Sequence, residues 1–266
     1  MKSKSIFLIL LLLCFVFGCN MVSGLMKRSG TLLIIEVESN EANLEKTTEQ
    51  AVKVLQSRLD AFGVSGDVTK TSANRIEVKI YNVTNPERIK NLLISQSRLE
   101  LSKVVSPPNP APAQIYPTEE AAIQSLGGKV PSNRKILPYK IRDVDTEKNK
   151  QWVIVESPPI VDGRDLRDAA AVSRTKNDSD YQITFSLNPA GAQKFGEWTG
   201  QNINNYLAVV LNDEVKSVAF IKSQITESGE ISGRFTKQSA EDLALILKSG
   251  YLAAKLTFVE EKTFGK

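Results

Sequence analysis

Residues 51–81 read AVKVLQSRLDAFGVSGDVTKTSANRIEVKIY, and this stretch decides the expected fold because its apolar period changes part-way along. Apolar residues first recur at spacings of three and four, which predicts one buried face of a helix that ends at Gly63. The period then becomes two, which predicts a hairpin with strands at 67–71 and 75–81. A helix followed by a hairpin forms the centre of a β-α-β-β-α-β unit.

The flanking sequence supplies the rest of that unit. The β-branched run at 31–38 predicts a first strand, and 99–105 predicts a closing strand. Between them, Asn85 can accept from free helix amides, while Pro86 costs no hydrogen bond in the first helical turn. The first half therefore predicts a ferredoxin-like subdomain with two helices on one face of an antiparallel sheet.

A proline-rich stretch at 106–117 holds five of the eleven prolines and predicts an extended, irregular linker. The patterns from 118 to 158 are mixed, with a short helix expected at 119–126 and strands expected at 136–141 and 152–155. Their order in a sheet cannot be derived from periodicity.

The carboxyl-terminal half repeats the alternation of strands and helices. The expected elements are a strand at 181–187, a helix from Asn188-Pro189 to about 204, a hairpin about Asn212-Asp213, a strand at 230–235, a helix from Thr236 to Gly250, and a strand at 255–260. The fold class is therefore expected to be α+β, with two ferredoxin-like β-α-β-β-α-β subdomains joined by the proline-rich linker.

The amino terminus has the layout of a secretion signal. Two lysines precede an apolar run from Ile6 to Phe17, which reaches only about 18 Å as a helix and is too short to span a bilayer. The following Gly18-Cys19 is similar to a bacterial lipobox, which makes Cys19 the expected lipid-attachment residue. An uncleaved anchor reaching Leu25 is the open alternative. Both interpretations place the rest of the chain outside the cytoplasm, in the bacterial cell envelope.

Composition excludes several classes of protein. Hydrophobic residues make up 41% and charged residues 24%, as in ordinary folded domains. Without residues 1–19, the net charge falls from +4 to +2, so no nucleic-acid partner is expected. The two cysteines, Cys14 and Cys19, both lie in the amino-terminal segment, which leaves no pair for a disulfide in the exported part.

The chain contains no histidine, which removes the usual general base, the common catalytic triads and most zinc sites. Asn177-Asp-Ser-Asp180 is interpreted as a solvated turn rather than a calcium loop, because Tyr181 breaks the ligand pattern. We therefore expect no enzyme activity, no cofactor and no metal. A hydrolase that uses carboxylates alone, hidden in 118–158, is the remaining enzymatic alternative.

Several segments resemble the extracytoplasmic domain of the protein-export subunit SecD. In the first half these are the helix 51–64, NRIEVKI at 74–80, NPERIK at 85–90 and LEL at 99–101. In the second half they are DGRDLRDA at 162–169, FSLNPAGA at 185–192, LAVVLN at 207–212, GEISGRF at 229–235 and AEDLALILKSG at 240–250. Their joint order over most of residues 24–265 carries the resemblance.

The resemblance implies a basal subdomain at 26–105, an irregular region at 106–160, and a head at 161–266 that includes a carboxyl-terminal return strand. In this family the head is inserted into the base, so the two halves can interleave in space. The chain stops at Gly265-Lys266, where family members continue into a bundle of membrane helices, so no proton pathway is expected in it.

The implied function is assistance to protein export by contact with unfolded preprotein as it emerges from the SecYEG translocon. The implied partners are that translocon and a SecF-type or SecD-type membrane protein. Trp198, Phe220 and Tyr251 are the candidate polypeptide-contact residues, although aromatic residues on helices and strands are more often core. The alternative is a lipid-anchored structural module that binds another envelope protein.

Overall fold

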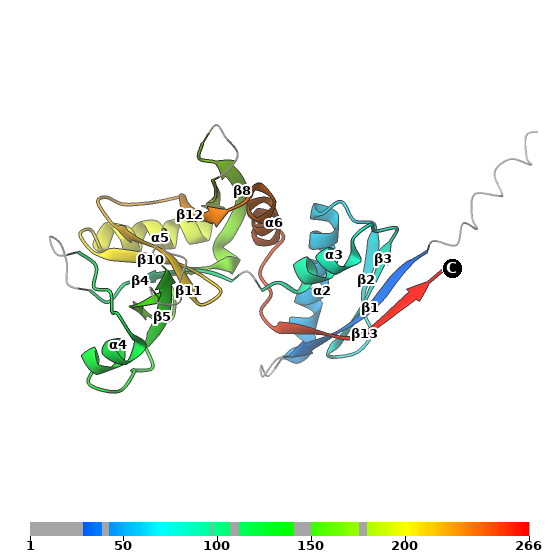
Figure 1. The fold of residues 1–266 in the computed structure, drawn as a ribbon, viewed down its shortest axis with the longest axis horizontal. Coiled ribbons are helices and arrows are strands. Elements are labelled where there is room, and N and C mark those ends of the chain that lie inside the picture. Colours follow the sequence, from blue (N-terminus) through cyan, green and yellow to red (C-terminus); the bar gives the residue numbers. More distant parts are fainter. Residues whose placement is uncertain are drawn as a thin grey trace, which may run out of the picture.

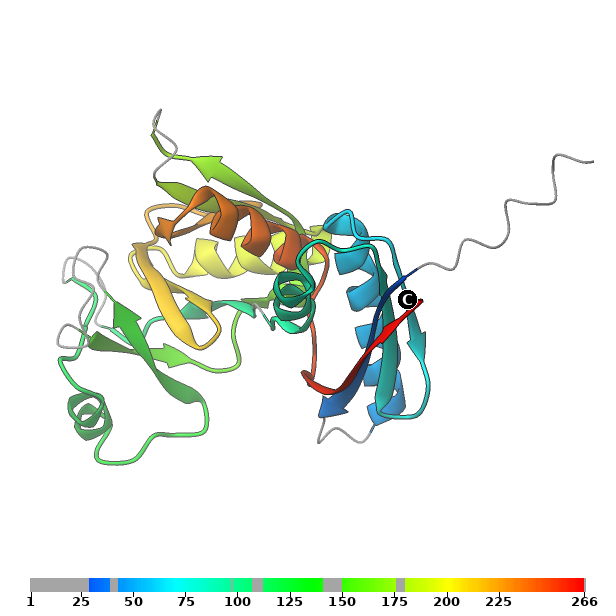
Figure 2. The same cartoon turned by 45° about the vertical axis from the view of Figure 1, so that its right-hand side comes forward.

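The computed structural model describes residues 29–38, 43–96, 98–106, 112–140, 150–175 and 180–265; Cys19 lies outside these ranges. Figures 1 and 2 show two bodies joined by short connections. We call the body built from residues 29–95 and 252–265 the base, and the body built from residues 98–251 the head.

The base has one sheet of four antiparallel strands in the order β13-β1-β3-β2. Its strands are β1 (Gly30–Glu38), β2 (Gly66–Lys70), β3 (Arg75–Tyr81) and β13 (Lys255–Phe264), and its helices are α2 (Leu44–Ala61) and α3 (Pro86–Ile94). The buried side chains of β1, β3, α2 and α3 form a single core. The expected strand 31–38, the expected helix and the expected hairpin of this half are confirmed.

The expectation that 99–105 closes this first unit is wrong. β4 (Leu99–Lys103) pairs with a head strand, and β13 returns from the far end of the sequence to pair with β1. Four of the five β4 residues are buried in succession, which requires cover on both faces of the strand. β13 has mostly exposed residues, as suits the edge of a sheet with one open face.

The head contains a six-stranded sheet in the order β6-β5-β11-β10-β4-β7. Its remaining strands are β5 (Arg134–Lys140), β6 (Lys150–Glu156), β7 (Val161–Asp162), β10 (Tyr206–Leu211) and β11 (Glu214–Phe220), and α4 (Glu119–Ser125) packs beside β5 and β6. A bridge between Val104 and Val155 joins the end of β4 to β6, so the sheet curls back on itself.

A second head sheet has three strands in the order β12-β9-β8. These are β8 (Leu166–Ser173), β9 (Tyr181–Leu187) and β12 (Ser228–Phe235); the helices are α5 (Pro189–Gln201), α6 (Lys237–Lys248) and the short 3₁₀ turn η2 (Gly163–Asp165). The prediction of a second β-α-β-β-α-β unit is wrong, because β9, β10 and β13 lie in three different sheets. The predicted hairpin of β10 and β11 is confirmed. β7 and β8 were not predicted, and the expected assembly of the other strands of this half into one sheet is wrong.

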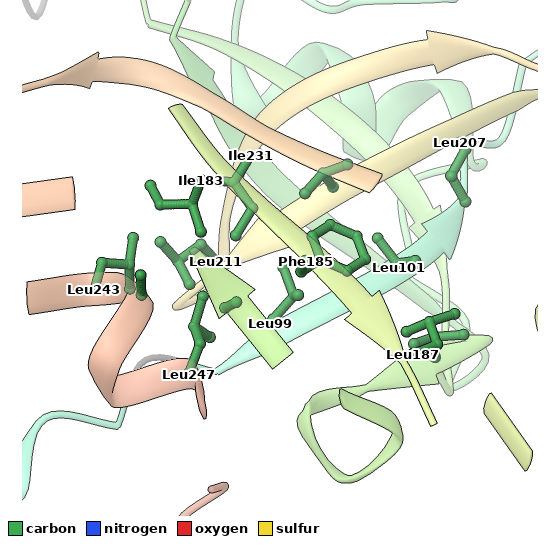
Figure 3. Close-up of a cluster of buried hydrophobic side chains, with 14 of the residues drawn as sticks. Leu99, Leu101, Ile183, Phe185, Leu187, Leu207, Leu211, Ile231, Leu243 and Leu247 are labelled. Atoms are coloured by element: carbon green, nitrogen blue, oxygen red, sulfur yellow. The ribbon is translucent and has the colours of Figure 1, made fainter. Parts of the chain in front are cut away.

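The main head core lies between these two sheets and the helices. Figure 3 shows Ile183 and Phe185 of β9 among Leu99 of β4 and Leu243 and Leu247 of α6, all of which are buried. This core holds together strands that are more than 100 residues apart in sequence. It explains why residues 98 to 103 belong to the head.

Local signals at the helix ends are confirmed. The side chains of Asn85, Asn188 and Thr236 accept hydrogen bonds from backbone amides three residues later, at 2.9 to 3.2 Å. Gly63 has φ +66°, the left-handed conformation expected just after α2.

Both edges of the base sheet are modified. At β2, Gln56 accepts from the Val68 amide at 3.2 Å and donates to the Gly66 carbonyl at 3.4 Å, so an α2 side chain occupies the position of a neighbouring strand. At β13, Val259 is an extra residue in the pairing with β1 and is 46% exposed. Such bulges twist an edge strand and interrupt its ladder.

None of the helices in the described residues is both long and apolar enough to cross a bilayer.

The two faces of β1 give a matched test of the base core. Leu33 is fully buried, whereas its neighbour Leu32 points to the open face and is partly exposed. We expect Leu33→Ala to lower the free energy of unfolding by about 3 kcal/mol through lost burial and a cavity. Leu32→Ala should cost less than about 1 kcal/mol. Urea unfolding followed by far-ultraviolet circular dichroism measures both, and equal losses would contradict this assignment of the two faces.

Candidate functional site

The three aromatic residues expected to contact polypeptide do not gather on one surface. Trp198 on α5 packs against the main head core. Phe220, at the end of β11, packs on a second head core and lies 5.3 Å from the Tyr206 ring. Each is partly exposed, so each has a buried side and a side that faces solvent.

Tyr251 lies where the head returns to the base. Its ring packs on Gly163, where a Cβ atom would come within 3.1 Å of the ring. The Gln50 side chain of α2 donates to the Tyr251 carbonyl. Close by in sequence, Asp242 of α6 forms an ion pair of 2.5 Å with Arg88 of α3. Tyr251 therefore belongs to a contact between base and head.

The motif residues of the carboxyl half form a structural junction around η2. Asp165 accepts from the Asp162 amide at 3.1 Å and forms a 2.8 Å ion pair with Lys194 of α5. Asn188 donates to the Arg164 carbonyl and its side chain also accepts from the Gly191 amide. These contacts fix the amino-terminal end of α5 to the turn before β8. The residues that carry the resemblance here are engaged in folding contacts rather than aimed at a ligand.

Electrostatics strengthen this junction. The Arg164 guanidinium donates to both Asp162 carboxylate oxygens, at 2.6 to 3.2 Å, and this pairing holds the pKa of Asp162 below its usual value. The Asp162 side chain is only 18% exposed, which limits screening by water. The junction is therefore most stable when Asp162 is ionised.

Arg58 of α2 is a buried charge that the sequence analysis missed. It is fully buried, and its Nη1 donates to the carbonyls of Leu92 at 3.1 Å and of Leu93, at the end of α3. Among the described residues, its Nε and Nη2 find no acceptor, and burial lowers the pKa of Arg58 to about 10. A cation at the carboxyl end of a helix is stabilised by the helix dipole. Arg58 lies on the apolar stripe of α2, three residues after Leu55. This position could have predicted from the sequence that Arg58 is buried.

Among the described residues of the head, two surface hollows bear on the candidate site. One, of about 270 Å³, is lined by Val105, Ser106, Gln114, Tyr116, Ser125, Leu126 and Ile154, and we call it the head hollow. The other, of about 200 Å³, lies on the three-stranded sheet beside Thr184 and Ser228. Both are smaller than typical cofactor or drug-sized sites. The head hollow combines apolar walls with polar side chains, as a site for single side chains of a polypeptide would.

Within the described parts of the chain, no three His, Cys, Asp or Glu side chains cluster as a metal site would require.

Two family models match the chain. The model described as "Protein translocase subunit SecDF, P1 domain, N-terminal" matches residues 48–106, and the model described as "SecDF, P1 head subdomain" matches residues 135–254. The first ends just past β4 and the second covers β5 to α6.

Curated relatives extend the similarity over most of the chain. The SecD protein translocase subunit of Aquifex aeolicus is 33% identical over 222 residues, which cover 83% of this chain and 40% of the relative. That of Elusimicrobium minutum is 32% identical over 256 residues, 91% of this chain and 53% of the relative. The chain thus spans between two fifths and about half of the length of these relatives.

Solved structures share the arrangement. A SecDF structure in the "Super-membrane-facing form" is 26% identical, with a TM-score of 0.65 over 97% of this chain and 35% of that chain. A second structure, described as "a membrane component SecDF that enhances protein export", gives a TM-score of 0.62 over 86% of this chain and 98% of that chain.

Two glycines of α5 test the η2 junction. A Cβ atom on Gly191 would meet the Asp165 Cβ at 2.7 Å and its carbonyl oxygen at 3.0 Å, whereas on Gly200 the nearest atom is 3.6 Å away. We expect Gly191→Ala to lower the free energy of unfolding by about 2 kcal/mol through overpacking. Gly200→Ala should raise it by up to about 1 kcal/mol through helix propensity. Thermal melts of the two variants measure the difference, and a stabilised Gly191→Ala variant would refute the close contact.

The Asp162–Arg164 pair predicts a dependence on pH. Because the folded pKa is depressed, the stabilisation is complete above the ordinary aspartate value of 3.8 and is lost as pH falls through the folded pKa. Asp162→Asn should therefore be less stable than the wild type at pH 7, and the gap should close below about pH 3.8. Urea midpoints between pH 7 and 3 measure this gap, with the exposed Glu241→Gln as the control. A gap that stays constant with pH would argue against the ion pair.

Proposed function

The chain belongs to the SecD family of protein translocase subunits over the family's P1 domain, and we propose that it assists protein export by contacting preprotein outside the cytoplasmic membrane. The observation that carries the proposal is the likeness of base and head together to the SecDF structures, with a TM-score of 0.65 over 97% of the chain. One of the structures is described as a membrane component that enhances protein export. The curated relatives of this chain are named as protein translocase subunits, so they share a role in protein translocation.

The partners follow from this role. The SecYEG translocon would supply the emerging preprotein, and a SecF-type or SecD-type membrane protein would hold the domain beside it. The amino-terminal segment would anchor the chain to the membrane, through lipid on Cys19 or through an uncleaved helix. The proposed function of the domain is to bind polypeptide rather than to catalyse a reaction.

The division of the chain follows the strand pairing. The base would be a ferredoxin-like subdomain interrupted by the head, since the order β13-β1-β3-β2 with helices after β1 and β3 supports that description. The head would be the insertion between about residues 98 and 251. The proline-rich stretch would then be a connection inside the head rather than a linker between two subdomains.

The head offers the more suitable surface for an unfolded chain. Both edges of the base sheet are interrupted, at Gln56 and Val259, which disfavours strand addition there. The head presents the apolar walls of the head hollow and the partly exposed rings of Trp198 and Phe220, and Tyr251 is partly exposed beside the contact between base and head. Contact through separate small apolar sites suits a substrate of variable sequence.

Photocrosslinking in cells tests this proposal. A benzophenone amino acid is placed at Trp198, Phe220 or Tyr251, and at Leu126 in the head hollow, while an exported protein is arrested midway through the translocon. We expect adducts to the arrested chain from one or more head positions, and fewer from the exposed Val259 of the base, which serves as the control.

Two results would contradict the proposal. Equal adduct yields with and without the arrested protein would refute the proposed contact with preprotein. Capture of one other envelope protein, independent of arrest, would favour the alternative of a structural binding module that shares the SecD fold.

A further inference from the structure

Most strands at the edges of the three described sheets are closed to further pairing. In the base, Gln56 bonds to β2 and the extra residue Val259 interrupts β13. In the six-stranded head sheet, β7 has only two residues, and the outer side of β6 is occupied because the Val105 amide donates to the Ile154 carbonyl at 2.8 Å. In the three-stranded sheet, the register of β12 with β9 shifts after Ile231. Such devices keep a sheet from pairing with another chain.

β8, at the other edge of the three-stranded sheet, keeps a regular register with β9 over its last six residues. Directly after β8, the Arg174 amide donates to the Asp180 carbonyl at 2.8 Å. Antiparallel pairs alternate between bonded and non-bonded, so this pair fixes the order of the whole ladder. The backbone groups of Ala169, Ala171 and Ser173 therefore face away from β9, toward the edge of the sheet.

The first of these outward amides already has a partner. The Ala169 amide donates to the Asp168 carboxylate at 2.9 Å, and the same carboxylate forms a 3.0 Å ion pair with Lys248 of α6. Further along, no described residue bonds to the outward backbone groups of Ala171 or Ser173. The open part of the edge therefore begins after Ala169, and these two residues each offer an amide and a carbonyl.

Side chains do not obstruct this part of the edge. Ala169 and Ala171 pack on the main head core, to which α6 contributes, whereas Ala170 and Val172 point to the opposite face and are exposed. Side chains stand above and below a sheet, and those of alanine reach only a short way from it. A strand placed beside β8 would therefore meet the backbone groups directly.

Free backbone groups define the chemistry of their ligand. The amides and carbonyls of alternate residues match those of any extended polypeptide, whatever its side chains, so strand addition reads no particular sequence. Only Ala171 and Ser173 offer both groups, so the contact is short and readily released. A site of this kind suits a substrate that has no fixed sequence and has to move past the head.

We propose that the edge of β8 at Ala171 and Ser173 is a binding site for an extended polypeptide segment, which joins the three-stranded sheet as an additional strand. The proposal rests on the preprotein contact put forward under the proposed function, and it specifies which atoms of the head make that contact. The preprotein binds here through its backbone, and none of its side chains is required.

Removal of one outward amide tests the site. The full chain, purified in detergent micelles, is titrated into a fluorescein-labelled peptide of alternating valine and threonine with lysine at both ends, and fluorescence anisotropy measures binding. Ala171→Pro deletes an amide that the pairing with β9 does not use, and proline is tolerated at such a position. We expect this variant to bind at least about fivefold more weakly, whereas Ala171→Ser, which keeps the amide, should bind as the wild type does.

Two further measurements do not depend on how well the proline variant folds. A peptide with the same side chains, but with esters in place of its central amides, should bind the wild type at least about fivefold more weakly, because an ester donates no hydrogen bond. A benzophenone amino acid at Val172 should give severalfold more peptide adducts than one at Val130. The two are head valines of matched exposure, at 40% and 37%.

The contrary results separate this proposal from the proposed function. If the ester peptide and the proline variant bind like their parents, or if positions 172 and 130 react equally, the β8 site is refuted. Crosslinks from Trp198 or Phe220 to arrested preprotein in cells would then leave preprotein contact standing. Adducts to a second copy of the chain in place of the peptide would make this edge an interface between copies and overturn the proposal. A wild type that neither binds the peptide nor crosslinks to arrested preprotein would refute both proposals.

Discussion

The pairing of β1 with β13 is the interaction on which the rest of the structure depends. It joins residues about 225 positions apart and runs along the whole of β1, from Gly30 with Phe264 to Glu38 with Lys255. If β13 did not pair with β1, Leu256 of β13 would lose its burial. β1, now a central strand, would become an edge of the sheet. The pairing also obliges the chain to leave and re-enter the base at one end, so that the whole head is carried on two neighbouring connections. The nine residues of β1 then separate the head from the chain ends by about 30 Å.

Local structure could be predicted from the sequence because its causes are local. The caps at Asn85, Asn188 and Thr236 and the turn at Asn212-Asp213 depend on residues within one helical turn or hairpin. Strand pairing could not be predicted in the same way, because an apolar run fits any sheet that can cover it. The apolar run at 99–105 therefore predicts a strand of the base, although the burial of β4 on both faces needs the centre of the head. β8 was missed because its small and charged residues carry no clear period.

The candidate site was harder to predict from the sequence than the strand pairing. The motifs at 162–169 and 185–192 could be identified because packing at η2 demands particular residues, such as a glycine at 191 beside Asp165. A surface that accepts many polypeptide sequences makes no such demand on its own residues. Trp198, Phe220 and Tyr251 were chosen for side-chain type alone, and the fold places them in three separate environments. Arg58 was missed for a related reason, since its partners are backbone carbonyls, which leave no mark in a sequence.

The Gln56 contact with β2 affects how readily the base sheet can pair with another polypeptide. A protein surrounded by extended polypeptides risks having its own sheet used as a template, because an open edge offers backbone groups to any strand that arrives. Gln56 occupies those groups with a side chain that belongs to the same molecule, and its local concentration exceeds that of any passing chain. The extra residue Val259 breaks the regular spacing at the other edge. Both edges of the base sheet are thus protected against acting as templates for β-aggregation.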